Sequence, residues 1–89
     1  MREIGGGVAL VTGGARRLGR AFAEGLAGRG MRIAVHYAAA EGAARELVGA
    51  LRSRGCDAEM FGADLRDAAA AAELPDRVAG HFGRLDVLV

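Results

Sequence analysis

The chain has 89 residues and a formal net charge of +1, so it can form one small domain and has no strong electrostatic attraction to nucleic acid or to an anionic membrane. All twelve basic residues are arginine, and lysine and asparagine are absent, which excludes a Schiff base on a protein lysine. The single cysteine, Cys56, cannot form an internal disulfide, and no apolar run is long enough to cross a membrane, so we expect a cytoplasmic protein.

Four short apolar runs predict β-strands. The first, at residues 8–12, is uninterrupted, as is typical of a strand buried on both faces of a parallel sheet, whereas Arg32 and Glu59 interrupt the second and third. The runs begin 23, 27 and 27 residues apart, which leaves room for one helix and two short loops in each interval. We therefore predict strands at 8–12, 31–35, 58–61 and 85–89.

The intervals between these strands carry apolar residues spaced four apart, a pattern that predicts helices with one apolar face packed on the sheet. A glycine follows each pattern, where a helix commonly ends in a left-handed residue. We expect Pro75 to open a separate helical segment after a short alanine-rich turn that starts at Asp67. The predicted packing positions are Leu18, Phe22 and Leu26, then Ala43, Leu47 and Leu51, then Leu74, Val78 and Phe82, and the glycines are Gly30, Gly55 and Gly83.

The alternation of strand and helix predicts the fold class. We expect an α/β fold with a doubly wound parallel sheet in the strand order 3-2-1-4, right-handed crossovers and flanking helices. In such a sheet a ligand binds at the carboxyl ends of the strands. Because the sequence ends inside the fourth predicted strand, we expect residues 1–89 to form the N-terminal half of a larger sheet.

Residues 12–19, Thr-Gly-Gly-Ala-Arg-Arg-Leu-Gly, join the first predicted strand to the first predicted helix. Glycines at this junction let the backbone turn tightly and approach a diphosphate, and the helix N-terminus offers unpaired N–H groups. Two known phosphate loops do not fit. Arg20 and Ala21 follow Gly19 where a triphosphate loop needs lysine and serine or threonine, and Ala15 replaces the second glycine of the pattern G-x-G-x-x-G.

The loop instead resembles that of the short-chain dehydrogenase/reductase family, T-G-x-x-x-G-x-G. Thr12, Gly13 and Gly19 match that pattern, and Arg17 replaces its middle glycine. This variant, together with the sequence His-Tyr at positions 36 and 37, is similar to the pteridine reductase branch of the family.

Two later segments strengthen the resemblance. Ala63-Asp64-Leu65 resembles the element that contacts adenine in the family, and residues 85–89 resemble the strand before its Asn-Asn-Ala-Gly turn. The resemblance implies a Rossmann-type half-domain that binds NADP(H), in an enzyme that reduces a carbonyl or pterin, is homo-oligomeric at full length and has no nucleic-acid or membrane partner. The implied cofactor-binding residues are Gly13, Gly14, Arg16, Arg17, Leu18, Gly19, His36, Tyr37, Asp64 and Leu65.

The choice of NADP(H) over NAD rests on charge. An NAD site usually ends its second strand with a carboxylate that accepts bonds from the ribose hydroxyls, but here no carboxylate follows His36 before Glu41. Arg16 and Arg17 can meet a 2′-phosphate with charge-assisted bonds, and the alternative is that both are solvated loop charges. Residues 38–40 are alanines where the pteridine reductase branch commonly has arginine and serine, which predicts a weaker hold on the phosphate.

The residues that carry proton transfer in the family are a serine, a tyrosine and a lysine, which an asparagine positions. Lysine and asparagine are absent, Ser53 lies on the second predicted helix, and Tyr37 is followed four residues later by Glu41 rather than lysine. We therefore expect no catalytic residue in this chain and no turnover by it alone. His36 and His81 lack partners at ligand spacing, so no metal site is predicted.

Three alternatives remain at this stage. The chain could be a non-catalytic dinucleotide-binding module, or an interaction fragment that pairs its apolar fourth strand with another chain. A methyltransferase that uses S-adenosylmethionine is disfavoured because the second strand lacks an acidic end. Asp64 has its own alternative role as the N-cap of the helical segment near Asp67.

Overall fold

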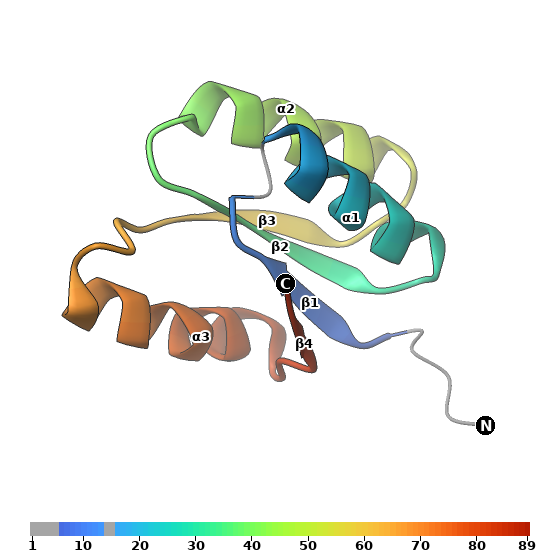
Figure 1. The fold of residues 1–89 in the computed structure, drawn as a ribbon. Coiled ribbons are helices and arrows are strands. Elements are labelled where there is room, and N and C mark those ends of the chain that lie inside the picture. Colours follow the sequence, from blue (N-terminus) through green and yellow to red (C-terminus); the bar gives the residue numbers. More distant parts are fainter. Residues whose placement is uncertain (1–5, 14–15) are drawn as a thin grey trace.

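A computed structural model describes residues 6–13 and 16–89 (Figure 1). Its four strands form one sheet in the order β3-β2-β1-β4, and every neighbouring pair is parallel. This confirms the predicted fold class and strand order. The strands are β1 (Val8–Val11), β2 (Arg32–Tyr37), β3 (Ala58–Gly62) and β4 (Val87–Leu88).

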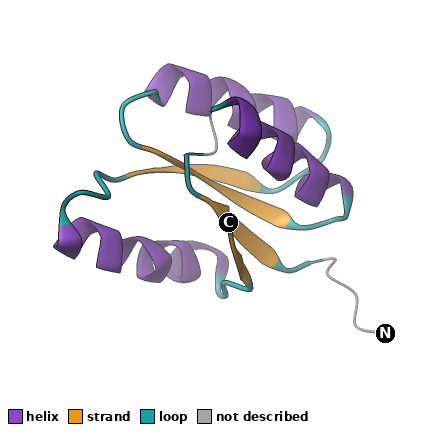
Figure 2. Ribbon diagram, viewed as in Figure 1, coloured by secondary structure: helices purple, strands orange, loops and turns teal. Residues whose placement is uncertain are grey.

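Helices cover both faces of the sheet, which gives three layers (Figure 2). The first two helices, α1 (Arg17–Gly28) and α2 (Glu41–Ser53), lie on one face, and α3 (Ala68–Phe82) lies on the other (Figure 1). Along β1, Ala9 and Val11 join the core beneath α1 and α2, whereas Val8 and Leu10 join the core above α3. Because both faces are covered, all four β1 residues are buried, as predicted for a parallel strand.

Strand β2 ends two residues later than predicted. The strand extends past Val35 to Tyr37, with His36 opposite Phe61 and Tyr37 opposite Gly62 in β3. The ladder to β3 continues for these two residues because β3 also runs one residue further, to Gly62. His36 and Tyr37 are therefore fixed by backbone pairing and are not part of a loose loop.

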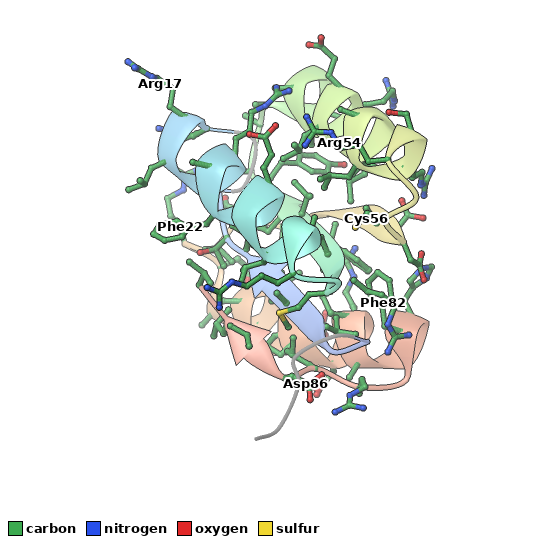
Figure 3. The ribbon with its side chains drawn as sticks, turned by 90° about the vertical axis from the view of Figure 1, so that its right-hand side faces the viewer. Arg17, Phe22, Arg54, Cys56, Phe82 and Asp86 are labelled. Carbon is green, nitrogen blue, oxygen red and sulfur yellow. The ribbon has the colours of Figure 1, made fainter. Side chains whose placement is uncertain are left out.

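The predicted packing face of the first helix is wrong at two of its three positions. Leu18 is 71% exposed and Phe22 is 47% exposed, and Phe22 lies on the side of α1 away from α2 (Figure 3). The helix instead packs through small residues: Ala23 is fully buried, and Ala27 and Leu26 pack beside it. In this chain α1 therefore packs on the sheet through Ala23, Leu26 and Ala27.

The other predicted packing positions are largely confirmed. Leu47, Leu51, Leu74, Val78 and Phe82 are buried, and Ala43 is half-buried. The three glycines that follow the helices have the expected left-handed backbone, with φ of 87° at Gly30, 84° at Gly55 and 86° at Gly83.

The predicted break at Pro75 is wrong, because α3 is continuous through it. Asp67 caps this helix: its side chain accepts bonds from the N–H groups of Ala69 and Ala70 at 3.0 and 3.3 Å. With that cap and a run of alanines in its first turns, the helix starts well before the proline. The proline then costs one backbone bond in the interior but does not end the helix. Among the described residues, no helix is long and apolar enough to cross a membrane.

Candidate cofactor site

The carboxyl ends of β1, β2 and β3 meet at one edge of the sheet, on the left in Figure 1. A pocket of about 160 Å³ opens there between the glycine loop after β1 and the end of β2. This is the edge where doubly wound sheets bind ligands. The residues that line the pocket are Gly13, Arg16, His36, Tyr37, Ala38, Ala39 and Ala40.

Gly13 turns the chain at the bottom of this loop. Its φ is +62°, in the region that only glycine adopts freely, and the space where a Cβ would stand is open. Its carbonyl accepts a bond from the N–H of Arg16 at 3.0 Å, which closes the turn into α1. Gly14, another predicted site residue, lies outside the described residues.

Among the described residues, no capping side chain lies at the positive N-terminal end of α1. Arg16 is the N-cap residue and makes no side-chain cap bond, and no acidic residue stands in the first turn. Arg17 adds positive charge to the same turn, and Arg20, which pairs with Glu24 at 3.7 Å, follows it; positive charge at this end disfavours the helix, and a bound anion would offset it. The contrast is α3, which Asp67 caps. The glycine loop therefore leads to a helix end that is suited to a phosphate.

The structure separates the two loop arginines that the sequence grouped together. Arg16 lines the pocket beside the end of β2. Arg17 is exposed and points away from the rest of the molecule (Figure 3). Leu18 is also exposed, and Gly19 is half-buried in the first turn of α1.

His36 lies beneath the pocket and is only 2% exposed. Its Nδ1 accepts a bond from the N–H of Gly13, and its Nε2 bonds to the carbonyl of Ala63, both at 2.9 Å. Both ring nitrogens are thus engaged by the backbone, and neither is left for a phosphate. The position of His36, two residues after buried Ala34 on a buried strand, indicates that the ring needs partners inside the protein, but it does not indicate which groups these are.

Tyr37 forms the next part of the pocket wall. Its side chain is half-buried, packs against the core under α1 and α2, and covers Gly62 so closely that a Cβ there would be 2.8 Å from the hydroxyl oxygen. Glu41, the first carboxylate after β2, pairs with Arg45 at 2.6 Å and does not line the pocket. No residue described as lining the pocket carries a negative charge.

Asp64 and Leu65 follow β3 on the same edge but do not line this pocket. Both carboxylate oxygens of Asp64 bond to the guanidinium of Arg66, at 3.0 and 3.1 Å, and this holds the pKa of the carboxyl below its ordinary value. Leu65 is 42% exposed. The N-cap of α3 is Asp67, so the alternative role considered for Asp64 belongs to another residue.

A larger pocket of about 510 Å³ lies at the opposite edge, where α1 and α2 end and β2 and β3 begin. Cys56 lies there, half-buried, with its sulfur 3.5 Å from the carbonyl of Met31. Burial, and then the charge of Asp57, raise the pKa of the thiol, which keeps it protonated and unreactive.

Comparison with known proteins decides the family. Residues 7–89 match the short chain dehydrogenase family. This chain belongs to that family. A versicolorin reductase of Emericella nidulans is 41% identical to this chain over 86 residues, which are 97% of this chain and 33% of that relative. The chain spans about a third of the length of the curated relatives that it matches.

Solved structures of the same family share the fold of this chain. A short chain dehydrogenase from Burkholderia cenocepacia, in complex with NADP, superposes with a TM-score of 0.92 at 38% identity, over 98% of this chain and 36% of that one. A relative from Burkholderia phymatum, in complex with NAD, superposes with a TM-score of 0.90 at 34% identity, over 99% of this chain and 31% of that one. The fold is therefore shared by proteins holding either dinucleotide, and side chains must decide between them.

Proposed function

We propose that this chain is the NADPH-binding part of an oxidoreductase that transfers a hydride to a carbonyl or pterin substrate. The observation that carries the proposal is the position of Arg16 in a pocket at the end of β2 whose lining holds no carboxylate. A 2′-phosphate placed there would meet a guanidinium and no like charge, which favours NADPH over NADH.

The described residues fit the rest of the dinucleotide. Gly13 makes a tight turn with open space beside it, and the uncapped end of α1 offers N–H groups and a positive dipole end to the diphosphate. Tyr37 and the alanines after it line the pocket and would form the wall for the adenosine ribose. Asp64 and Leu65 follow β3 at the same edge of the sheet, outside this pocket, and would approach the adenine. The nicotinamide, when bound, supplies the hydride.

We assign binding but no chemical step to this chain. Carbonyl reduction needs a proton donor within about 3 Å of the developing alkoxide. The only tyrosine, Tyr37, lines the pocket proposed for the adenosine end of the cofactor, and Ser53 ends α2. The proton donor would therefore belong to the remainder of a longer protein, whose substrate, homo-oligomeric assembly and cytoplasmic location are part of the same proposal.

The pteridine reductase branch remains a finer proposal. It rests on Arg17 in the loop and on the pair His36-Tyr37. The relative with 41% identity is a versicolorin reductase and does not favour that branch, so ketone and quinone substrates belong in the test beside pterins.

The direct test is a calorimetric titration of the chain with NADPH and with NADH. We expect NADPH to bind about tenfold more tightly or better, and Gly13→Val to abolish binding because valine does not tolerate a φ of +62°. Gly49→Val is the matched control, since it adds the same side chain in open space on α2. Equal affinity for the two cofactors would refute the assignment.

A second assay separates the enzyme from a non-catalytic binding module. Cofactor absorbance is followed with pterins, quinones and ketones, for the chain alone and for the longer protein. We expect no turnover by the chain alone and turnover by the longer protein. Turnover by the chain that is lost in Gly13→Val would show that its own residues catalyse, and a longer protein that binds NADPH but reduces nothing would favour the binding module.

A further inference from the structure

We propose that His36 is a positioning residue that fixes the glycine loop, and through it Arg16, without contacting the cofactor. The inference rests on the function proposed above and adds a residue role to that site. Among residues 6–13 and 16–89, His36 is the one polar or charged side chain that is buried. Burying an imidazole is unfavourable unless its nitrogens are bonded, so its two bonds need an explanation.

The partners of the ring fix its tautomer. The N–H of Gly13 can only donate, so Nδ1 must accept, and the carbonyl of Ala63 can only accept, so Nε2 must carry the proton. The structure therefore assigns the neutral Nε2–H form to His36. A proton on Nδ1 would oppose the N–H of Gly13 and break that bond.

The two bonds join three strand ends. Gly13 follows β1, His36 is in β2, and Ala63 follows β3, where its own N–H donates to the carbonyl of Tyr37 at 3.1 Å. The ring thus spans the edge on which the proposed cofactor site is built. It connects the glycine loop with the segment that leads to Asp64.

The path from His36 to the pocket passes through one residue. The ring holds the N–H of Gly13, and the carbonyl of Gly13 accepts the bond from the N–H of Arg16 at 3.0 Å. The space beside Gly13 is open, so no side chain packs against the position of its missing Cβ. His36 is the described side chain that bonds to this glycine, and losing its Nδ1 bond would release the turn that presents Arg16.

Two substitutions separate the two bonds. In His36→Asn, the amide oxygen stands where Nδ1 stood and can accept from Gly13, but the side chain is too short for Ala63. In His36→Gln, the amide nitrogen can reach the place of Nε2 and donate to Ala63, but no acceptor is left for Gly13. Each variant keeps one of the two hydrogen bonds and loses the other, so both variants should lose a similar amount of folding free energy. A difference in cofactor binding between them would then come from the bond to Gly13.

The experiment measures NADPH affinity by calorimetry and the exchange of the Gly13 amide by NMR. We expect His36→Asn to stay within about threefold of the unmodified affinity, and His36→Gln to bind about 3- to 10-fold more weakly, the loss of one net hydrogen bond. The Gly13 amide should exchange slowly in the unmodified chain and in His36→Asn, and quickly in His36→Gln. Nitrogen shifts of the unmodified ring should report the Nε2–H form.

Two results would overturn the inference: equal affinity in both variants, or a protected Gly13 amide in His36→Gln. If the unmodified chain fails to bind NADPH, the proposed function fails. The amide exchange and the ring shifts then still report whether His36 holds Gly13, so the two failures are distinguishable. Melting temperatures of both variants show whether either has lost its fold.

Discussion

Replacing Arg16 with alanine should remove most of the preference for NADPH over NADH. Arg16 lines the pocket at the end of β2, where the 2′-phosphate of NADPH is proposed to bind. A charge-assisted hydrogen bond contributes about 1.5–3 kcal/mol, and the exposure of Arg16 moves the expectation to the lower end. The affinity for NADPH should therefore fall about tenfold at low salt, whereas the affinity for NADH, which lacks the phosphate, should hardly change.

Arg17→Ala is the matched control in this calorimetric comparison, because it removes the same charge from a side chain that does not line the pocket and points away from the rest of the molecule (Figure 3). It should lower both affinities alike, through its weaker, screened attraction to the cofactor. Raising the salt concentration should reduce the difference in NADPH affinity between the unmodified chain and Arg16→Ala. The reasoning is refuted if Arg17→Ala removes the preference and Arg16→Ala leaves it intact.

Three further changes test other parts of the structure. Gly62→Ala would place a Cβ 2.8 Å from the Tyr37 hydroxyl oxygen, so the Tyr37 ring should shift and NADPH should bind more weakly in a fluorescence titration. The free energy of unfolding should fall by only about 1 kcal/mol. The control is Gly49→Ala, which has open space around it and should not weaken NADPH binding. Leu47→Ala, in the core under α2, should lower the urea-derived free energy of unfolding by about 2–5 kcal/mol, and a loss below 1 kcal/mol would contradict that core. Arg84 and the N–H of Val8 hold the pKa of Asp86 below its ordinary value. The ionised carboxylate therefore stabilises the fold above the ordinary carboxyl pKa, and this stabilisation is lost as the pH falls through the lowered pKa. Asp86→Asn should accordingly reduce the decrease in melting temperature that the unmodified chain shows at acid pH.

The fold was predictable because its signals repeat. The uninterrupted run that became β1, the helical patterns of α2 and α3, and the glycines with positive φ each indicated the same alternation. The errors arose where tertiary packing overrode local pattern. Leu18 and Phe22 were expected in the core but are exposed, because α1 approaches the sheet through Ala23. Pro75 was expected to break a helix that the Asp67 cap had already started.

The site was predictable by location but less so by role. The glycine loop and the end of β2 do meet in one pocket. From the sequence, however, Arg16 and Arg17 were equally good candidates to bind the phosphate, because the direction of each side chain depends on where α1 begins. His36 was expected to touch the cofactor because the resemblance to the family implied it. Its two backbone partners, Gly13 and Ala63, are 23 and 27 residues away, and no local pattern reveals such bonds.

Four of the seven residues that line the pocket are glycine or alanine, and Arg16 is the charged one among them, so the preference between cofactors depends on very few charges. Ala38 lines the pocket directly after Tyr37, the last residue of β2, and an NAD site usually carries a carboxylate at this end of the strand. Ala38→Asp should therefore invert the preference, because a carboxylate there accepts bonds from both ribose hydroxyls and repels a 2′-phosphate. We expect NADPH to bind at least tenfold more weakly and NADH more tightly, with Ala38→Asn as the control that keeps the size and removes the charge. If both variants weaken NADPH equally, the pocket excludes the phosphate by volume, and charge at the end of β2 does not select the cofactor.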